Sequence, residues 1–119
     1  MACKNKLRMK SLQRGDLVWV NLDPIDRVGA EIRKQRPCII VSRSVLNDKR
    51  LTVVVIPLSS SSTPRPPLVV AVPSAGANSN ARIDQIRAVD KSRIGATLGK
   101  LNRAEIEAVE QSLRTVLEL

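Results

Sequence analysis

The 119-residue chain must fold around a core that is almost free of aromatic side chains. It contains no Phe and no Tyr, and Trp19 is its only aromatic residue, although 43% of its residues are hydrophobic. Apolar content of this size is enough for one ordinary domain and too high for a disordered chain. We therefore expect a core of Val, Ile, Leu and Ala that includes Trp19, and no aromatic platform for stacking nucleic-acid bases.

Histidine is also absent, which removes the commonest general base and the commonest metal ligand. The two cysteines, Cys3 and Cys38, are far apart in the chain, so a zinc site is excluded and a disulfide framework is not expected. Phosphate-binding glycine motifs and carboxylates at calcium-binding spacing are missing as well. We expect no metal and no cofactor, and catalysis by Ser-His-Asp or Cys-His groups is excluded.

The hydrophobic segments are short. The longest apolar run, residues 53–58, has six residues, whereas a membrane-spanning helix needs about 20. The basic start of the sequence lacks the apolar stretch of a signal peptide. These features predict a protein of the reducing cytoplasm with no membrane partner.

Positive charge is concentrated in the first half of the chain. There are 20 Lys and Arg residues against 11 Asp and Glu, a net charge of +9. Residues 1–50 account for most of this excess, and residues 1–14 hold five cations and no acid. We interpret residues 1–14 as a loose basic arm ahead of a single domain at 15–119. The excess indicates a polyanionic partner, either a nucleic acid or an acidic protein.

Alternating and β-branched segments predict a mainly β fold. The expected strands are residues 16–22, 38–42, 51–58, 68–72 and 81–89. The segment 38–42 is apolar throughout, so we expect it to be buried on both faces. In the last expected strand, alternation places Arg82, Asp84 and Ile86 on one face. Residues 44–49 fit one helical turn.

The end of the sequence predicts a helix. Asn102 is a good N-cap, and Glu105 three residues later completes a capping box. An apolar stripe at helical spacing follows, made of Ile106, Val109, Leu113, Val116 and Leu117. The predicted fold class is therefore mainly β with a C-terminal helix (α+β), with five or more largely antiparallel strands and no second domain.

Five segments in a fixed order carry a more specific pattern. They are Gly15–Pro24, Gly29–Glu31, Gln35–Ser42, Ile56–Ser60 and Arg82–Arg87. Together with the expected terminal helix they resemble the MazF/PemK toxins, the ribonucleases of bacterial toxin–antitoxin systems, and the last segment resembles the Kid/PemK branch. The resemblance implies an SH3-like barrel, a homodimer, sequence-specific and metal-independent cleavage of single-stranded RNA, and neutralisation by a cognate acidic antitoxin.

The resemblance also implies site residues. The arginine of the family's Arg-Pro pair falls on Arg36, the family's third-strand hydroxyl falls on Ser59 where threonine is usual, and the loop glutamate falls on Glu31. Ile32 follows that glutamate where the family often has glutamine. The implied catalytic residues are Arg36, Ser59, Arg82, Asp84 and Glu31. The implied RNA-binding residues are Arg33, Lys34, Gln35, Gln85 and Arg87.

These side chains suit cleavage by the RNA's own 2′-OH, which leaves a 2′,3′-cyclic phosphate and a 5′-OH. Asp84 can act as the general base for that hydroxyl, and Glu31 is the alternative base. Arg36 can hold two phosphate oxygens, and Ser59 can donate one hydrogen bond to the developing charge. Arg82 can stabilise the same charge electrostatically.

Other interpretations of the same residues stay open. Arg36 can simply pair with Glu31 at the surface, and Arg82 can pair with Asp84 across a strand face. A plain RNA-binding SH3-like module would need no catalysis. A gyrase-poisoning toxin like CcdB acts through C-terminal residues that include a tryptophan, whereas the only tryptophan here is Trp19.

Overall fold

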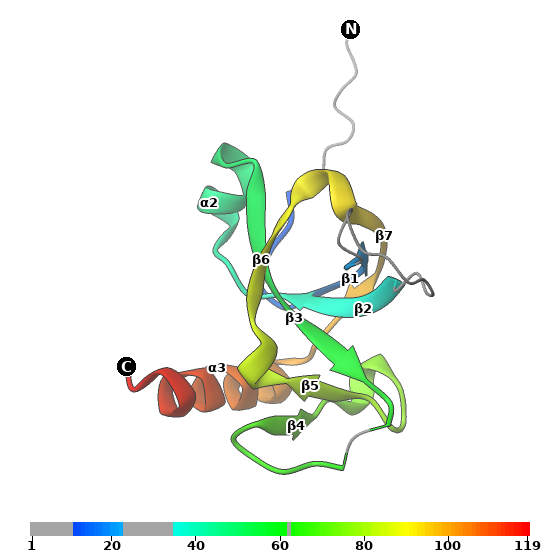
Figure 1. Ribbon diagram of the computed structural model, residues 1–119, viewed down its shortest axis with the longest axis vertical. Helices are drawn as coiled ribbons and strands as arrows, with labels where there is room; N and C mark the ends of the chain where they lie inside the picture. Colours follow the sequence, from blue (N-terminus) through cyan, green and yellow to red (C-terminus); the bar gives the residue numbers. More distant parts are fainter. Residues whose placement is uncertain (1–10, 23–34, 62) are drawn as a thin grey trace, which may run out of the picture.

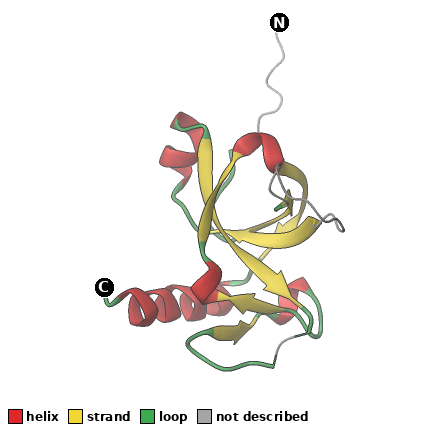
Figure 2. Ribbon diagram, in the orientation of Figure 1, coloured by secondary structure: helices red, strands yellow, loops and turns green. Residues whose placement is uncertain are grey.

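The computed structural model describes residues 11–22, 35–61 and 63–119, which form a curved antiparallel sheet with one long helix packed against it (Figure 1). The strands are β1 (Asp16–Asn21), β2 (Gln35–Ile40), β3 (Thr52–Ser59), β4 (Val69–Ala71), β5 (Asn80–Arg82), β6 (Arg87–Asp90) and β7 (Ile94–Lys100). The helices are α2 (Ser44–Lys49) and α3 (Arg103–Leu117), with 3-10 turns η1 (Pro73–Ala75), η2 (Ile83–Gln85) and η3 (Lys91–Arg93) (Figure 2). The predicted class, mainly β with a C-terminal helix, is confirmed. No helix among the described residues is long and apolar enough to cross a membrane.

Strand β3 is the centre of the sheet, because it pairs with three neighbours. Strand β2 lies along one of its edges, while β6 and β5 share the other edge, β6 along the first half and β5 at the end. The strand order is β4-β5-β3-β2-β1-β7, with β6 off this path, and every pairing is antiparallel. One long strand therefore connects the two halves of the sheet.

The prediction of a single strand over residues 81–89 is wrong. Strand β5 ends at Arg82, and the turn η2 intervenes before β6 begins. Ile83 in this turn is fully buried, so the chain turns inward where an extended strand would have continued. As a result, Arg82, Asp84 and Ile86 do not share one face of a strand.

The physical reason for the interruption lies in the two registers of β3. Val55 faces Arg87 on β6, and Leu58 faces Ala81 on β5. Over this interval β3 advances three residues, whereas its partner chain runs six residues. The additional length cannot pair, and it forms η2 as a large bulge.

Two surface features differ from the sequence prediction. Trp19, expected in the core, is 39% exposed, because it follows Leu17 along β1 to a part of the sheet beyond the buried clusters. Strand β7 was not predicted, since its two glycines and its exposed residues give no alternation of apolar and polar side chains. Gly95 of β7 lies beside the tryptophan, where a Cβ atom would be 3.6 Å from the Trp19 Cβ.

The sheet buries aliphatic side chains on both faces. The cluster under α3 contains Leu17, Ile39, Val41, Ile56, Leu58, Val70, Val72, Ala81, Ile83, Leu101 and Val109. The cluster inside the curve of the sheet contains Val18, Val20, Cys38, Ile40, Val53, Val55 and Val89. Strand β2 contributes to both, which confirms that the segment from Cys38 onward is buried on both faces. Leu117, assigned to the helical stripe, is 47% exposed and marks the end of that stripe.

The predicted capping box of α3 is present and extends to a second element. The Asn102 side chain accepts a hydrogen bond from the Glu105 N–H at 2.8 Å, and Glu105 Oε1 accepts one from the Asn102 N–H at 2.9 Å. Glu105 Oε2 also accepts a bond from the N–H of Ser74 in η1, at 2.8 Å. Burial raises the pKa of Glu105, but the hydrogen bonds from Ser74 and Asn102 outweigh it and hold the pKa below its ordinary value.

Replacing this carboxylate should weaken the fold in a pH-dependent way. We expect Glu105→Gln to lower the free energy of unfolding by about 1–2 kcal/mol near neutral pH, because one of the two N–H donors then faces an amide NH₂. Because the pKa is lowered in the folded state, the ionised carboxylate stabilises the folded state fully above the ordinary glutamate pKa of about 4.3. This stabilisation is lost as the pH falls through the folded-state pKa. Urea unfolding should therefore show the difference in unfolding free energy between wild type and variant becoming smaller as the pH falls below about 4.3.

The matched control is Glu107→Gln, since Glu107 is exposed on the same helix. It should change stability by less than about 0.5 kcal/mol. A gap between wild type and Glu105→Gln that is as large in acid as at neutral pH would contradict the assigned role of the carboxylate.

Candidate active site

The registers of the central strands bring three predicted site residues to one face of the sheet. Cys38 on β2 faces Pro57 on β3, and Arg36 and Ser59 each lie two residues further along their own strands, on the same face as this pair. Ser59 faces Asn80 on β5, and Arg82 lies two residues further along β5. Because side chains alternate along a strand, Arg36, Ser59 and Arg82 share this face.

Arg87 joins the same group from β6. It faces Val55, which lies on the face of β3 that also carries Pro57 and Ser59. Val55 and Cys38 belong to the apolar cluster inside the curve of the sheet. The face that carries Arg36, Ser59, Arg82 and Arg87 therefore continues this cluster toward the end of β3. We call it the cationic face, and its arginines lie next to buried aliphatic side chains.

The Cys38 thiol lies on the same face and is influenced by two of these arginines. The charges of Arg87 and Arg36 both act on the thiol and favour the thiolate, but burial outweighs them and raises the pKa of Cys38 to about 12. The thiol is fully buried and lies 3.7 Å from the Arg36 carbonyl oxygen, to which it donates. Sequence reasoning missed this residue as part of the site, although its position two residues after Arg36 in a strand was a signal for it.

Ser59 is held at the last position of β3. The residue is 8% exposed, and its Oγ accepts a hydrogen bond from the Ser61 N–H at 3.2 Å. The Ser61 hydroxyl lies 3.2 Å from the same oxygen. The backbone contact fixes where Ser59 Oγ lies.

Asp84 and Gln85 lie on η2, directly after Arg82, and both are exposed. Buried Ile83 anchors the turn, and its N–H donates to the Leu68 carbonyl at 2.9 Å. Within the part of the chain that the structure describes, no ion pair involves Asp84, so the alternative of a structural Arg82–Asp84 pair is not supported. The carboxylate lies on a short anchored turn beside the cationic face.

The remaining predicted residues are placed differently. Gln35 faces Asn21 across β1 and β2, on the opposite face from its neighbour Arg36. Glu31, Arg33 and Lys34 lie outside the described residues, so the structure places neither the alternative base nor this part of the predicted RNA contact. Across residues 11–22, 35–61 and 63–119, no cluster of three or more Cys, Asp and Glu side chains could hold a metal ion.

The described site thus combines three guanidinium groups, a fixed hydroxyl and a nearby carboxylate. One guanidinium group can bind two phosphate oxygens at once, and it keeps its charge at any physiological pH. A face with three of them attracts a phosphodiester backbone, and the hydroxyl adds a neutral polar group to it. The arrangement can bind a phosphodiester and stabilise added negative charge on its phosphorus.

Comparison with known proteins identifies the family of this chain. Residues 13–117 match the family model described as the PemK-like, MazF-like toxin of type II toxin-antitoxin systems. The endoribonuclease MazF9 of Mycobacterium tuberculosis (strain ATCC 25618 / H37Rv) is 26% identical over 117 residues, which cover 91% of this chain and 98% of the relative. The chain belongs to the PemK-like, MazF-like toxin family, and the family resemblance inferred from its sequence is confirmed.

Solved structures give the same fold. A mycobacterial endoribonuclease in complex with its cognate antitoxin has a TM-score of 0.74 at 25% identity, covering 93% of this chain and 97% of the other. MazF in a MazE–MazF complex from Deinococcus radiodurans has a TM-score of 0.79 at 24% identity, covering 93% and 99%. At that identity the Deinococcus protein supports the fold alone.

The buried thiol should take no chemical part in catalysis. With a pKa of about 12, Cys38 carries almost no thiolate near neutral pH, and the thiolate is the reactive form. We expect iodoacetamide to leave Cys38 unmodified in the folded protein and to alkylate it in denaturant, as measured by peptide mass mapping. Cys38→Ala should retain most of the activity. Rapid alkylation of the native protein at Cys38, with loss of function, would show that the thiol is reactive.

Proposed function

We propose that this toxin is a metal-independent endoribonuclease that cleaves single-stranded messenger RNA at specific sequences. The observation that supports the proposal is the strand pairing around β3: Arg36 and Ser59 each lie two residues beyond the Cys38–Pro57 pair, on the face toward which alternation also directs Arg82 and Arg87. The 26%-identical M. tuberculosis relative, which is named an endoribonuclease, supports the same activity.

In the proposed reaction RNA supplies its own nucleophile. Asp84 removes the proton from the 2′-OH, whose oxygen then attacks the adjacent phosphorus, and Glu31 is the alternative base. The Arg36 guanidinium binds the phosphate oxygens as negative charge grows on them, and the Ser59 hydroxyl donates one further hydrogen bond. The bond to the 5′-oxygen breaks, and Arg82 stabilises the departing oxygen until it is protonated. The products are a 2′,3′-cyclic phosphate and a 5′-OH.

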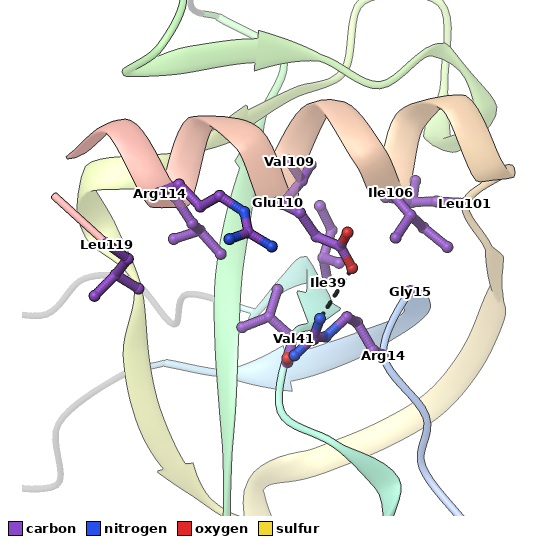
Figure 3. A pocket seen from close by; sticks show the side chains of 11 residues that line it. Arg14, Gly15, Ile39, Val41, Leu101, Ile106, Val109, Glu110, Arg114 and Leu119 are labelled. Carbon is purple, nitrogen blue, oxygen red and sulfur yellow. Dashed lines mark hydrogen bonds and ion pairs between the residues drawn. The ribbon is translucent and has the colours of Figure 1, made fainter. Parts of the chain in front are cut away.

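The flanking residues extend the RNA contact. Arg87 lies on the same face of the sheet, and Gln85 is exposed on η2 next to the proposed base. We assign both to RNA binding, together with Arg33 and Lys34. Gln35 begins β2 on the opposite face from Arg36, and we assign it to RNA binding at that edge of the strand. Of the five cations in residues 1–14, Arg14 pairs with Glu110 of α3 at 2.9 Å (Figure 3) and so belongs to the domain, whereas Lys4, Lys6, Arg8 and Lys10 add positive charge that can contact the RNA backbone.

Partners and location follow from the same proposal. A mycobacterial structure with a TM-score of 0.74 pairs an endoribonuclease with its cognate antitoxin, and a net charge of +9 favours an acidic partner here. We therefore propose a cognate acidic antitoxin as the neutralising partner, a homodimer as the active form, and the cytoplasm, where messenger RNA is found, as the location.

The direct test is cleavage of a long RNA by the purified protein in excess EDTA. We expect cleavage to persist, because no step of the mechanism uses a metal, and we expect products with 2′,3′-cyclic or 3′-phosphate ends and 5′-OH ends, identified by end labelling and mass spectrometry. Loss of cleavage with chelator, or 5′-phosphate ends, would contradict the mechanism. RNA binding without cleavage would support a binding module, and trapping of DNA gyrase would support a CcdB-like toxin.

Substitutions should show whether Arg36 or Ser59 contributes more to the rate of cleavage. Arg36→Ala removes a full charge, and we expect it to slow cleavage by about 10²–10³-fold or more. Arg36→Lys should not restore activity, since a point charge cannot reproduce the planar guanidinium. Ser59→Ala removes one neutral hydrogen bond and should cost less, whereas Ser59→Thr should keep or raise activity because its β-branch restricts the hydroxyl. Single-turnover cleavage of one RNA measures all four.

Arg103→Ala provides the matched control, because Arg103 is an exposed arginine in the first turn of α3, away from the cationic face. It should cleave at nearly the wild-type rate. Far-UV circular dichroism checks that each variant is folded. Near-wild-type cleavage by folded Arg36→Ala would remove this arginine from the site, and a larger loss from Ser59→Ala would reverse the ranking.

A further inference from the structure

Arg65 has no part in the proposed cleavage, yet the strand pairing directs its side chain to the cationic face. Val69 of β4 faces Arg82 of β5, and Arg65 forms an antiparallel bridge with Val69 at the other edge of β4. Residues that face each other across antiparallel strands project their side chains from the same side of the sheet. Arg65 therefore continues a row that runs from Arg82 through Val69 to the edge of the sheet.

The burial pattern of the strands supports this orientation independently. Leu58 on β3 faces Ala81 on β5, Ala81 faces Val70 on β4, and all three are buried in the cluster under α3. The next residue along each strand projects from the opposite side of the sheet, which is the side of Ser59 and Arg82. The row that ends at Arg65 is therefore on the side away from α3, and the Arg65 side chain is exposed there.

The backbone at Arg65 is held by the turn that leads into β4. The Arg65 N–H donates to the Val69 carbonyl at 2.7 Å, and the Arg65 carbonyl accepts from the N–H groups of Val69 and Leu68, both at 3.0 Å. Pro66 and Pro67 occupy the turn, and their rings restrict its backbone. The arginine thus projects from a fixed point, which reduces the conformational freedom lost when it binds a ligand.

The charge of Arg65 is not neutralised by the described part of the chain. Across residues 11–22, 35–61 and 63–119, no acidic side chain lies within ion-pair distance of it. Neighbouring strands are about 4.8 Å apart, so two steps place the Arg65 backbone about 10 Å from that of Arg82. This separation suits two different phosphates of one RNA strand better than two oxygens of the same phosphate.

We propose that Arg65 is a further RNA-binding residue, which binds a backbone phosphate other than the one that is cleaved. The inference rests on the proposed function, because it takes the cleaved phosphate to lie at Arg36 and Ser59. A guanidinium that binds a neighbouring phosphate raises the affinity for RNA, but it does not stabilise the charge that develops in the transition state. A phosphate contact also carries no base information, so Arg65 acts on all RNA sequences alike.

The first test measures binding of a mixed-sequence 2′-O-methyl RNA, which lacks the nucleophilic 2′-OH and is not cleaved. Arg65→Gln should weaken binding about fivefold at low salt, as for one exposed ion pair. It should also reduce the slope of log affinity against log salt concentration by about 0.7, the value for one contact to a single strand. Arg65→Lys should keep most of that slope, because a lysine neutralises a phosphate as a point charge.

Arg103→Gln is the matched control, since Arg103 is an exposed arginine of α3, away from this row. It should change neither the affinity nor the slope. Arg65→Gln keeps the backbone hydrogen bonds of the turn, and far-UV circular dichroism checks that it is folded. An unchanged slope for folded Arg65→Gln, as expected if Arg65 binds an acidic protein instead of RNA, would overturn the proposal.

The second test separates RNA binding from the chemical step. In cleavage of a substrate RNA, Arg65→Gln should raise KM about fivefold and leave kcat within about twofold of wild type. A loss of kcat as large as that of Arg36→Ala would overturn the proposal. A wild-type protein that binds RNA without cleaving it would contradict the proposed ribonuclease activity, whereas the salt slope of the uncleavable RNA would still decide the role of Arg65.

Discussion

Strand β2 is buried on both faces along Cys38, Ile39 and Ile40, and the rest of the structure depends on this constraint. Its side chains alternate between the two aliphatic clusters, so the strand cannot slip by one residue without exchanging one set for the other. The same register decides which way Arg36 points where the strand leaves the core. The orientation of the cationic face is thus a consequence of hydrophobic burial.

A core with no Phe or Tyr fits this two-sided arrangement. Val, Ile and Ala are short, so both faces of one strand can be covered within a small domain, and β-branched side chains pack well on a pleated surface. The helix covers one face, and the curve of the sheet closes the other. Gly15 lies where β1 approaches α3, and its φ of +97° is strained for any residue with a side chain, whose Cβ would lie 2.7 Å from Ile106 Cδ1.

The sequence predicted most of this fold because local pattern and final packing agree in most segments. The capping box of Asn102 and Glu105 and the two-sided burial of β2 are encoded in a few neighbouring residues. The bulge at η2 is different, since it arises from two registers on one distant strand and has no local signature beyond charges in an apolar segment. Trp19 was misplaced for the same reason, because its exposure depends on where α3 and the curve of the sheet stop covering β1.

The candidate site, like the fold, could be predicted from the sequence only in part. Family resemblance selected Arg36, Ser59 and Arg82, and strand parity explains how they come to one face. The positions of Cys38 beneath the arginines and of Gln35 on the opposite face became visible only with the strand pairing. The contact of the Glu105 carboxylate with Ser74, which joins the helix to η1, likewise required the tertiary structure.

The half-exposed position of Trp19 has a practical consequence for studying this protein. It is the only aromatic side chain in the chain, and it lies on the surface formed by β1, β2 and β7, facing Pro37 and beside Gly95. Ultraviolet emission from the protein therefore comes from a single indole that senses water at this surface. A macromolecule that covers the surface will shift the emission to shorter wavelength and shield it from soluble quenchers, so the unlabelled chain carries its own optical reporter of contacts there.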